Sequence, residues 1–247
     1  MRRIYQTDES RKNFFSTVFY AYNDESAYLT SSSVLQARFD DERVRIETED
    51  DKAERVVKKL KSIDPRSLQE IDKILRSGNA EKEQIAFEYL KLIVKYGKNA
   101  RERLTIPAVR NAMDEVMRVG YEVHRLHGFL RFQECESGIY YGACAPDNDI
   151  LDLLSPHFVA RLKTQPFVIH DVKRSKAVLY NGDKSIVVPF CDPTFNVSNR
   201  EKQIALLWKK YYHTVAIPER KNLRQMKNYM PVRYWKFMHE KDGDDLS

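Results

Sequence analysis

Four residues that could carry out acid–base chemistry form two short-range pairs. His157 and Arg161 lie four residues apart, and His170 is followed directly by Asp171. A histidine near a carboxylate can act as a general base or bind a metal. These residues are therefore the candidate catalytic set of a hydrolase or lyase that acts on nucleic acid or a nucleotide. Their convergence in one cleft would favour the enzyme, and their dispersion would favour a binding protein.

The geometry of a strand also supports a structural role for the second pair. Adjacent strand residues point to opposite faces, so His170 and Asp171 cannot form a hydrogen-bonded pair simply by being neighbours. In this interpretation Asp171 pairs with Arg174 at the end of the strand. His170 is then a hydrogen-bonded residue of the sheet.

His124 and His127 are three residues apart on a predicted helix, with Glu122 nearby. This spacing places both imidazoles on one side of the helix and is compatible with a metal. No third ligand follows in a recognisable motif, and histidine is also favoured by the dipole at a helix end. We therefore predict no metal site and no cofactor.

The three cysteines, Cys135, Cys144 and Cys191, are widely separated. They lack the close spacing of zinc or iron–sulfur ligands, and their odd number implies no disulfide framework. Each falls in a predicted strand, where a small buried cysteine is common. We expect all three to be structural.

Residues 217–240, called the basic–aromatic segment below, combine cations with large rings. We expect a helix from about Pro218 to Tyr229, with Leu223, Met226 and Met230 docked on a core and a cationic opposite face. Pro231 should end this helix. The predicted nucleic-acid-binding residues are Arg220, Lys221, Asn222, Arg224, Lys227, Arg233, Tyr234 and Lys236.

The cations and the rings of this segment together suit the backbone phosphates and the stacked bases of a nucleic acid. We expect Trp235 to be mainly structural and Tyr234 to be the better candidate for ligand contact. Two alternatives remain open. In the first, the segment is a solvated helix followed by aromatic residues that anchor the C-terminus. In the second, the protein is an adaptor that binds no nucleic acid, and its cationic helix binds an acidic partner protein.

The same residues resemble a known family. The run ERKN at 219–222, followed by Met230, Pro231 and RYW at 233–235, resembles the C-terminal signature of a bacterial domain family described as probable DNA-metabolism or DNA-repair proteins. Further similarities span residues 121–240: GFLRF at 128–132, YY at 140–141, SPHFVARL at 155–162, FVIHD at 167–171 and LWKKYY at 207–212.

The resemblance implies a role in DNA repair or modification beside a radical S-adenosylmethionine protein. Related domains are fused to uracil-DNA-glycosylase-like modules, and no established catalytic mechanism comes with the family. The chain departs from the family pattern at Leu223 and at Gln225-Met226, and its opening QTDES at 6–10 replaces the usual Asp-Gly-Ser-Phe-like start.

Charge is distributed unevenly over the 247 residues. The net charge is +6, acidic residues crowd positions 40–54, and the basic–aromatic segment lies near the other end. This asymmetry indicates a surface for a polyanion, which we expect to be DNA. No apolar run reaches the length that spans a membrane, and no apolar stretch follows Arg2-Arg3, so we expect a cytoplasmic protein without a signal peptide.

The first half of the chain reads as mostly helical, with short strands at Ile4-Tyr5 and near Val44. Apolar spacing predicts helices at residues 14–22, 54–63, 65–75, 85–96 and from 107 to about 123. Asp64 should cap the helix at 65–75, with Pro65 at its first position, and Gly97 should end the helix at 85–96.

From residue 128 the apolar period changes to two. Strands are predicted at 129–135, 139–145, 167–172, 177–181 and 185–190, with a hairpin turn at Asn181-Gly182. A helical turn at Asp149 should restart at Ser155-Pro156. Another helix, bearing Ile204, Leu207, Trp208, Tyr211 and Val215, should cover one face of the sheet.

We therefore predict an α+β fold with a mainly antiparallel sheet of about five strands covered by helices. We treat residues 1–247 as a single domain that has a helical subdomain at 48–127 and a sheet-containing core at 128–240.

Overall fold

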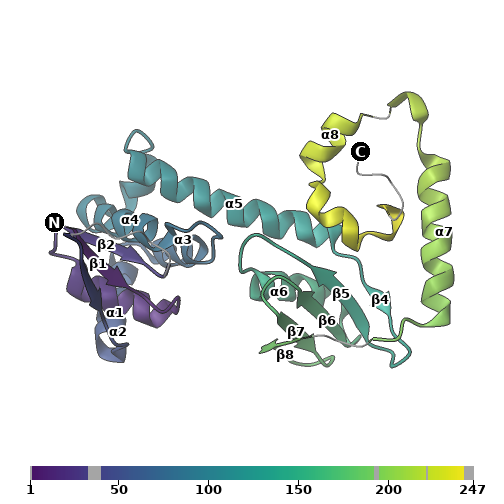
Figure 1. Cartoon of the computed structure of the whole chain (residues 1–247), viewed down its shortest axis with the longest axis horizontal. Coiled ribbons are helices and arrows are strands. Elements are labelled where there is room, and N and C mark those ends of the chain that lie inside the picture. Colours follow the sequence, from purple (N-terminus) through teal and green to yellow (C-terminus); the bar gives the residue numbers. More distant parts are fainter. Residues whose placement is uncertain (1, 33–39, 192–194, 221, 242–247) are drawn as a thin grey trace. The chain divides into compact units, whose positions relative to one another are not determined.

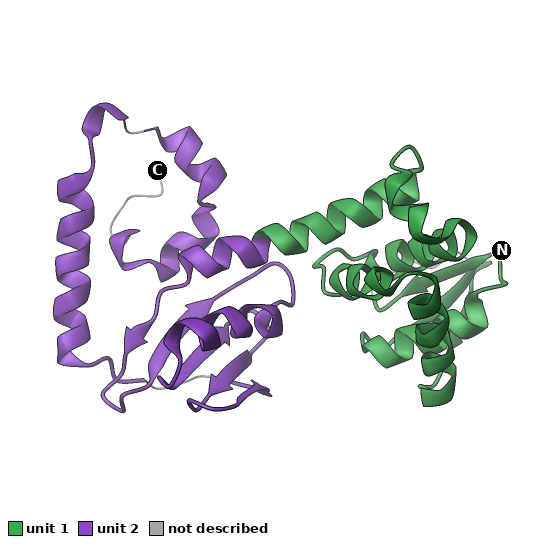
Figure 2. Cartoon of the chain, turned by 180° about the vertical axis from the view of Figure 1, so that it is seen from behind, with its two compact units in different colours: residues 1–121 green, residues 122–247 purple. Residues whose placement is uncertain are grey.

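The computed structural model describes residues 2–32, 40–191, 195–220 and 222–241. The chain forms two compact units, residues 1–121 and 122–247 (Figure 2). Helix α5 (Pro107–Phe129) contributes residues to both.

Unit 1 combines a small sheet with helices. Strands β2 (Ala27–Thr30), β1 (Arg3–Gln6) and β3 (Glu42–Arg45) lie in that order, and both outer strands are parallel to β1. The helices are α1 (Arg11–Ala21), α2 (Asp50–Ile63), α3 (Pro65–Leu75), α4 (Lys82–Tyr96) and the 3₁₀ turn η1 (Gly97–Glu102).

The helical prediction for this half is confirmed, including its caps. The Asp64 side chain accepts a hydrogen bond from the backbone N–H of Arg66, and Pro65 opens α3. Gly97 ends α4 with φ at 64°. Strand β2 was not predicted.

Unit 2 contains the five-stranded sheet. Its order is β4 (Gln133–Glu134), β5 (Tyr140–Cys144), β6 (Phe167–Asp171), β7 (Lys176–Tyr180) and β8 (Ser185–Pro189) (Figure 1). The α+β class is confirmed. The sheet is mixed, because β5 and β6 are parallel while the other neighbours are antiparallel. Helix α6 (Leu151–Leu162) links the parallel pair, as a crossover connection requires.

The predicted hairpin between β7 and β8 is confirmed. Gly182 has φ at 99°, and the Asn181 side chain accepts hydrogen bonds from the backbone N–H groups of Asp183 and Lys184. Only glycine adopts this conformation at little cost.

The predicted helix restart at Ser155-Pro156 is wrong, because α6 is continuous and contains Pro156. A proline inside a helix leaves the carbonyl four residues earlier without its partner, which here is Asp152. The Ser155 hydroxyl donates a hydrogen bond to that carbonyl at 3.3 Å. Ser155 thus compensates for the proline and is not a cap.

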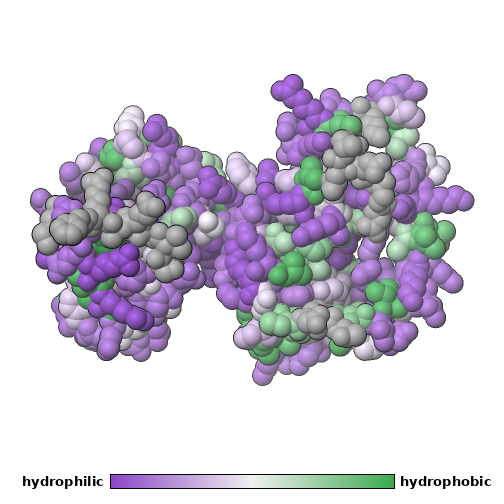
Figure 3. All heavy atoms as spheres, viewed as in Figure 1, coloured by the Kyte–Doolittle hydropathy of each residue, from purple (hydrophilic) through white to green (hydrophobic). Residues whose placement is uncertain are grey.

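Helix α7 (Asn199–Val215) does not bury its apolar stripe on the sheet, contrary to the prediction. Leu207 is 67 % exposed and Tyr211 56 %. The helix lies beside β4 at the edge of the sheet (Figure 1), where the Glu201 carboxylate accepts from the backbone N–H of Glu134. Hydrophobic residues therefore lie on the surface over α7 (Figure 3).

The basic–aromatic segment is broken into short pieces. They are η2 (Pro218–Arg220), α8 (Leu223–Tyr229), η3 (Val232–Phe237) and, after it, η4 (His239–Lys241). The single helix predicted over 218–229 is wrong, because Asn222 caps a new helix by accepting from the N–H of Gln225. Leu223 is 47 % exposed and does not dock on a core. Lys221 lies outside the described residues.

No helix among the described ranges combines the length and the apolarity needed to cross a membrane.

Candidate functional site

His170 is a hydrogen-bonded residue of the sheet. Its Nδ1 lies 2.8 Å from the Tyr141 hydroxyl, and its ring makes an edge contact with Phe190. Burial lowers the pKa of His170, more than the Asp171 carboxylate and a hydrogen bond to the Phe190 backbone raise it. Burial also raises the pKa of Tyr141. The structural interpretation of His170 is confirmed.

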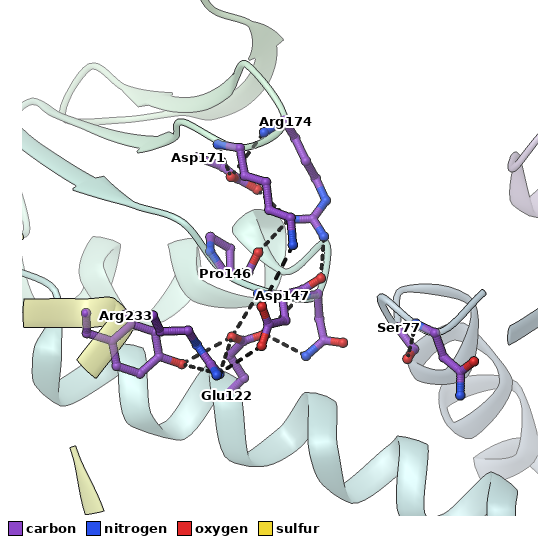
Figure 4. A network of polar contacts seen from close by, with 11 residues as sticks. Ser77, Glu122, Pro146, Asp147, Asp171, Arg174 and Arg233 are labelled. Atoms are coloured by element: carbon purple, nitrogen blue, oxygen red, sulfur yellow. Dashed lines mark hydrogen bonds and ion pairs between the residues drawn. The ribbon is translucent and has the colours of Figure 1, made fainter. Parts of the chain in front are cut away.

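Asp171 is fully buried and forms the turn and ion pair that the sequence offered as an alternative. Its carboxylate accepts from the backbone N–H groups of Lys173 and Arg174 and lies 2.9 Å from the Arg174 guanidinium. The guanidinium also donates to the carbonyls of Pro146 and Asp147 (Figure 4). These contacts leave Asp171 no access to a substrate.

The other candidate catalytic residues lie on α6. His157 stacks on His127 with ring centroids 4.1 Å apart, and Arg161 is exposed. Burial, with the nearby His157 and His124, lowers the pKa of His127.

Helix α6 and His170 occupy opposite faces of the sheet. On the α6 side, Phe132 contacts Phe158 of α6 and Phe167 of β6. His170 is three residues beyond Phe167 on that strand, so its side chain points to the other face. The structure therefore does not assemble the candidate catalytic set in one cleft.

Among the described residues, no three His, Cys, Asp or Glu side chains are grouped so that they could hold a metal ion. Cys135 and Cys144 are buried, as predicted. Cys191 is exposed and follows β8, so the prediction of a buried strand position is wrong for this residue.

A buried carboxylate that the sequence did not single out for this role anchors the basic–aromatic segment (Figure 4). Glu122 is 2 % exposed and accepts hydrogen bonds from the backbone N–H groups of Asp147 and Asn148 and from the Asn148 amide. It also accepts from the Tyr234 hydroxyl and from Arg233, each at 3.1 Å. Arg233 forms a second ion pair with Asp147.

This anchor determines which residues of the segment face inward. Tyr234 is 2 % exposed, and burial together with the Glu122 charge raises its pKa to about 12. A ring so buried offers no face to a base, so Tyr234 does not fit the ligand-contact role that the sequence favoured. One feature of the sequence could have revealed this buried anchor: Glu122 lies on the same helix stripe as Val119 and Leu126, which are buried.

Trp235 anchors the segment, as predicted. The indole is 5 % exposed and donates to the Met230 carbonyl at 3.0 Å. Further along, Glu240 accepts two hydrogen bonds from Arg131, at 3.1 Å from Nε and 2.7 Å from Nη2. Burial raises the pKa of Glu240, but the hydrogen bonds and the charge of Arg131 outweigh it, and the pKa lies below its ordinary value.

The outward side of the segment carries cations. Arg220, Asn222, Arg224, Lys227 and Lys236 are exposed. Arg224 and Lys227 lie three residues apart on α8, and neither forms an ion pair with any residue that the structure describes. The adjoining Tyr229 is 72 % exposed. We call Arg220, Arg224, Lys227 and Tyr229 the α8 surface.

Helix α7 exposes a second pair of rings. Trp208 and Tyr211 are stacked with centroids 5.6 Å apart, and they are 43 % and 56 % exposed. Sequence reasoning missed these rings and Tyr229 as contact candidates, since it assigned the α7 stripe to the core.

A cleft of about 230 Å³ lies between the segment and the sheet. Its residues on the sheet side are Arg131, Gln133, Tyr141 and Ala143, and those of the segment are Lys236, Phe237, Met238 and His239.

These features define an α+β protein whose second unit holds a cationic C-terminal segment by buried polar contacts. Residues 80–240 match the family described as a domain of unknown function, DUF4130, and the chain belongs to this family. No curated protein matches the chain.

Proposed function

We propose that this protein binds nucleic acid through the α8 surface, and that it acts in DNA repair or modification together with a radical S-adenosylmethionine protein. The observation that carries the binding is a set of exposed cations on α8, without ion pairs in the described part of the chain, next to an anchored stretch of the segment. Arg224 and Lys227 are exposed and make no ion pair among the described residues, while the flanking segment is held through Tyr234 and Trp235. The DNA role and the partner follow from the family resemblance alone.

The Trp235 indole ties the end of α8 to this anchored stretch through the Met230 carbonyl, which limits the conformational freedom lost when a ligand binds to the segment. Cations on such a segment bind phosphates and release counterions, so affinity should fall steeply with salt. The exposed ring of Tyr229 supplies a stacking surface that the buried Tyr234 does not.

Fluorescence anisotropy with labelled single- and double-stranded DNA at several salt concentrations tests the proposal. Replacing Arg224 and Lys227 together by alanine should weaken binding and reduce the salt slope by about 2, at about 0.9 per phosphate contact. The control is Lys184→Ala, which removes an exposed charge on the β7–β8 hairpin. Absence of binding at low salt, or an equal effect of the control, would refute the proposal.

The protein-adaptor alternative is favoured by one observation, the apolar side chains on α7. Leu206 and Leu207 are 69 % and 67 % exposed, and exposed apolar patches commonly mark protein contacts. Co-expression with the radical S-adenosylmethionine protein, followed by anaerobic size-exclusion chromatography, should show co-elution that Leu207→Glu abolishes. Co-elution without DNA binding would favour the adaptor, and separate elution would count against the partner.

The hydrolase or lyase alternative gains no support from the geometry. His157 and Arg161 lie on α6, and His170 points to the opposite face of the sheet.

A further inference from the structure

The cleft between the sheet and the segment gathers hydrogen-bond donors. The Arg131 guanidinium uses three of its five N–H groups, two toward Glu240 and one toward the Gly128 carbonyl, and two remain. Lys236 is exposed, with its ammonium 4.8 Å from the Phe237 ring centroid. Arg131 lines the cleft on the sheet side and Lys236 lines it on the side of the segment.

His239 adds a polar atom that is buried and unsatisfied. Its Nε2 has no hydrogen-bond partner among the described residues. An unpaired buried nitrogen is unfavourable, so a ligand that bonds to it removes this cost. The Arg131 charge is balanced by Glu240, whereas Lys236 has no acidic partner among the residues described here. The cleft therefore favours an anionic group.

The remaining lining indicates more than a simple anion. The volume of about 230 Å³ exceeds the ~150 Å³ of an apolar cavity that accommodates benzene. Phe237, Met238 and Ala143 supply apolar surface, and Gln133 supplies an amide that can both donate and accept. An inorganic phosphate would leave this part of the cleft empty, whereas a planar ring would fill it.

Tyr141 contributes an acceptor. Its hydroxyl lies 2.8 Å from His170 Nδ1, and which of the two groups donates depends on the tautomer of the ring. A hydroxyl oxygen has two lone pairs, so in either tautomer at least one is left to accept a bond from a ligand. A sugar hydroxyl or a base amino group provides such a donor.

We propose that this cleft binds a nucleoside monophosphate, with its phosphate at Lys236, Arg131 and His239 and its nucleoside against Phe237 and Gln133. The ligand is either a free nucleotide or the phosphorylated end of a strand. In the second form the inference rests on the proposed nucleic-acid binding, and in the first it is independent of it.

Isothermal titration calorimetry of the full chain with thymidine monophosphate, thymidine and inorganic phosphate tests the ligand class. The monophosphate should bind at least ten times more tightly than either fragment. Lys236→Ala and His239→Gln should each weaken it about tenfold or more, while tryptophan fluorescence shows that both variants stay folded. Lys184→Ala, on the β7–β8 hairpin outside the cleft, should leave this affinity unchanged.

Competition with oligonucleotides separates the two sources. A strand with a 5′- or 3′-phosphate that displaces the monophosphate ten times better than the unphosphorylated strand identifies a strand end, and equal displacement identifies a free nucleotide. No monophosphate binding at millimolar concentration, equal binding of inorganic phosphate, or wild-type affinity of both cleft variants would overturn the inference. Monophosphate binding without any strand binding would refute the α8 proposal and retain the cleft.

Discussion

The buried carboxylate of Glu122 provides a sharp test of how the basic–aromatic segment is held. It accepts five hydrogen bonds, from Asp147, Asn148, Tyr234 and Arg233, in a site where it is 2 % exposed. In Glu122→Gln the shape is retained, but one oxygen becomes an NH₂ group that cannot accept. Oε2 accepts two of the bonds and Oε1 three, so at least two donors lose their acceptor whichever way the amide points.

Hydrogen bonds to charged groups contribute about 1.5–3 kcal/mol each. The two bonds to Oε2, both from Asn148, are the smallest set that the substitution can remove. Two bonds at the low end give about 3 kcal/mol, which is about a hundredfold in the unfolding equilibrium. Tyr234→Phe removes one such bond and leaves the carboxylate four donors, so at the low end it should cost only about 1.5 kcal/mol.

Urea unfolding followed by tryptophan fluorescence measures this change in the right part of the molecule. The chain has two tryptophans, Trp208 and Trp235, and both lie in unit 2. The matched control is Glu136→Gln at an exposed position, which should stay within about 0.5 kcal/mol of the parent. If Glu122→Gln and Tyr234→Phe were as stable as this control, the network would not be what holds the segment.

Two further predictions concern the same unit. The pKa of Glu240 is lowered in the folded protein, so its contribution to stability is present above its ordinary pKa of 4.5 and is lost as the pH falls through the folded pKa. Glu240→Gln should therefore flatten the loss of unfolding free energy below about pH 4.5. An unchanged pH profile would show that the contact with Arg131 does not lower this pKa. A Cβ on Gly182 would lie 2.8 Å from the Thr164 carbonyl oxygen, whereas one on Gly138, also at positive φ, would meet nothing within 4 Å. Gly182→Ala should thus cost about 1–3 kcal/mol more than Gly138→Ala in the same urea experiment, and equal costs would show that the hairpin shifts freely.

The sequence predicted best those features whose cause lies within a few residues. The cap at Asp64-Pro65 and the turn at Asn181-Gly182 depend on local backbone chemistry, and both are confirmed. The parallel pairing of β5 with β6 depends on the path of α6 between them, which no period of two reveals. The prediction therefore reached the α+β class and the strands but not the mixed sheet.

The candidate site was harder to predict because its contacts join distant parts of the chain. Tyr234 and Glu122 are 112 residues apart, and no spacing rule connects them. The stripe on α7 misled for a different reason. Apolar spacing indicates that a face is suited to burial, but Leu207 and Tyr211 stay exposed because the described contacts of α7 run through Glu201 and its junction with η4.

Inward and outward residues alternate closely in the segment, so its two proposed binding activities can be separated by single changes. Lys236 is exposed at the cleft, directly after the buried Trp235, and Lys227 is exposed on α8. Because Lys236 belongs to both the cationic outer side and the cleft, Lys236→Ala should weaken both strand binding and monophosphate binding. Lys227→Ala should weaken strand binding alone, and His239→Gln should weaken the monophosphate and phosphorylated strand ends but not an unphosphorylated strand. If all three variants reduced every ligand equally while remaining folded, a single diffuse electrostatic surface would account for binding, and the cleft would have no specific role.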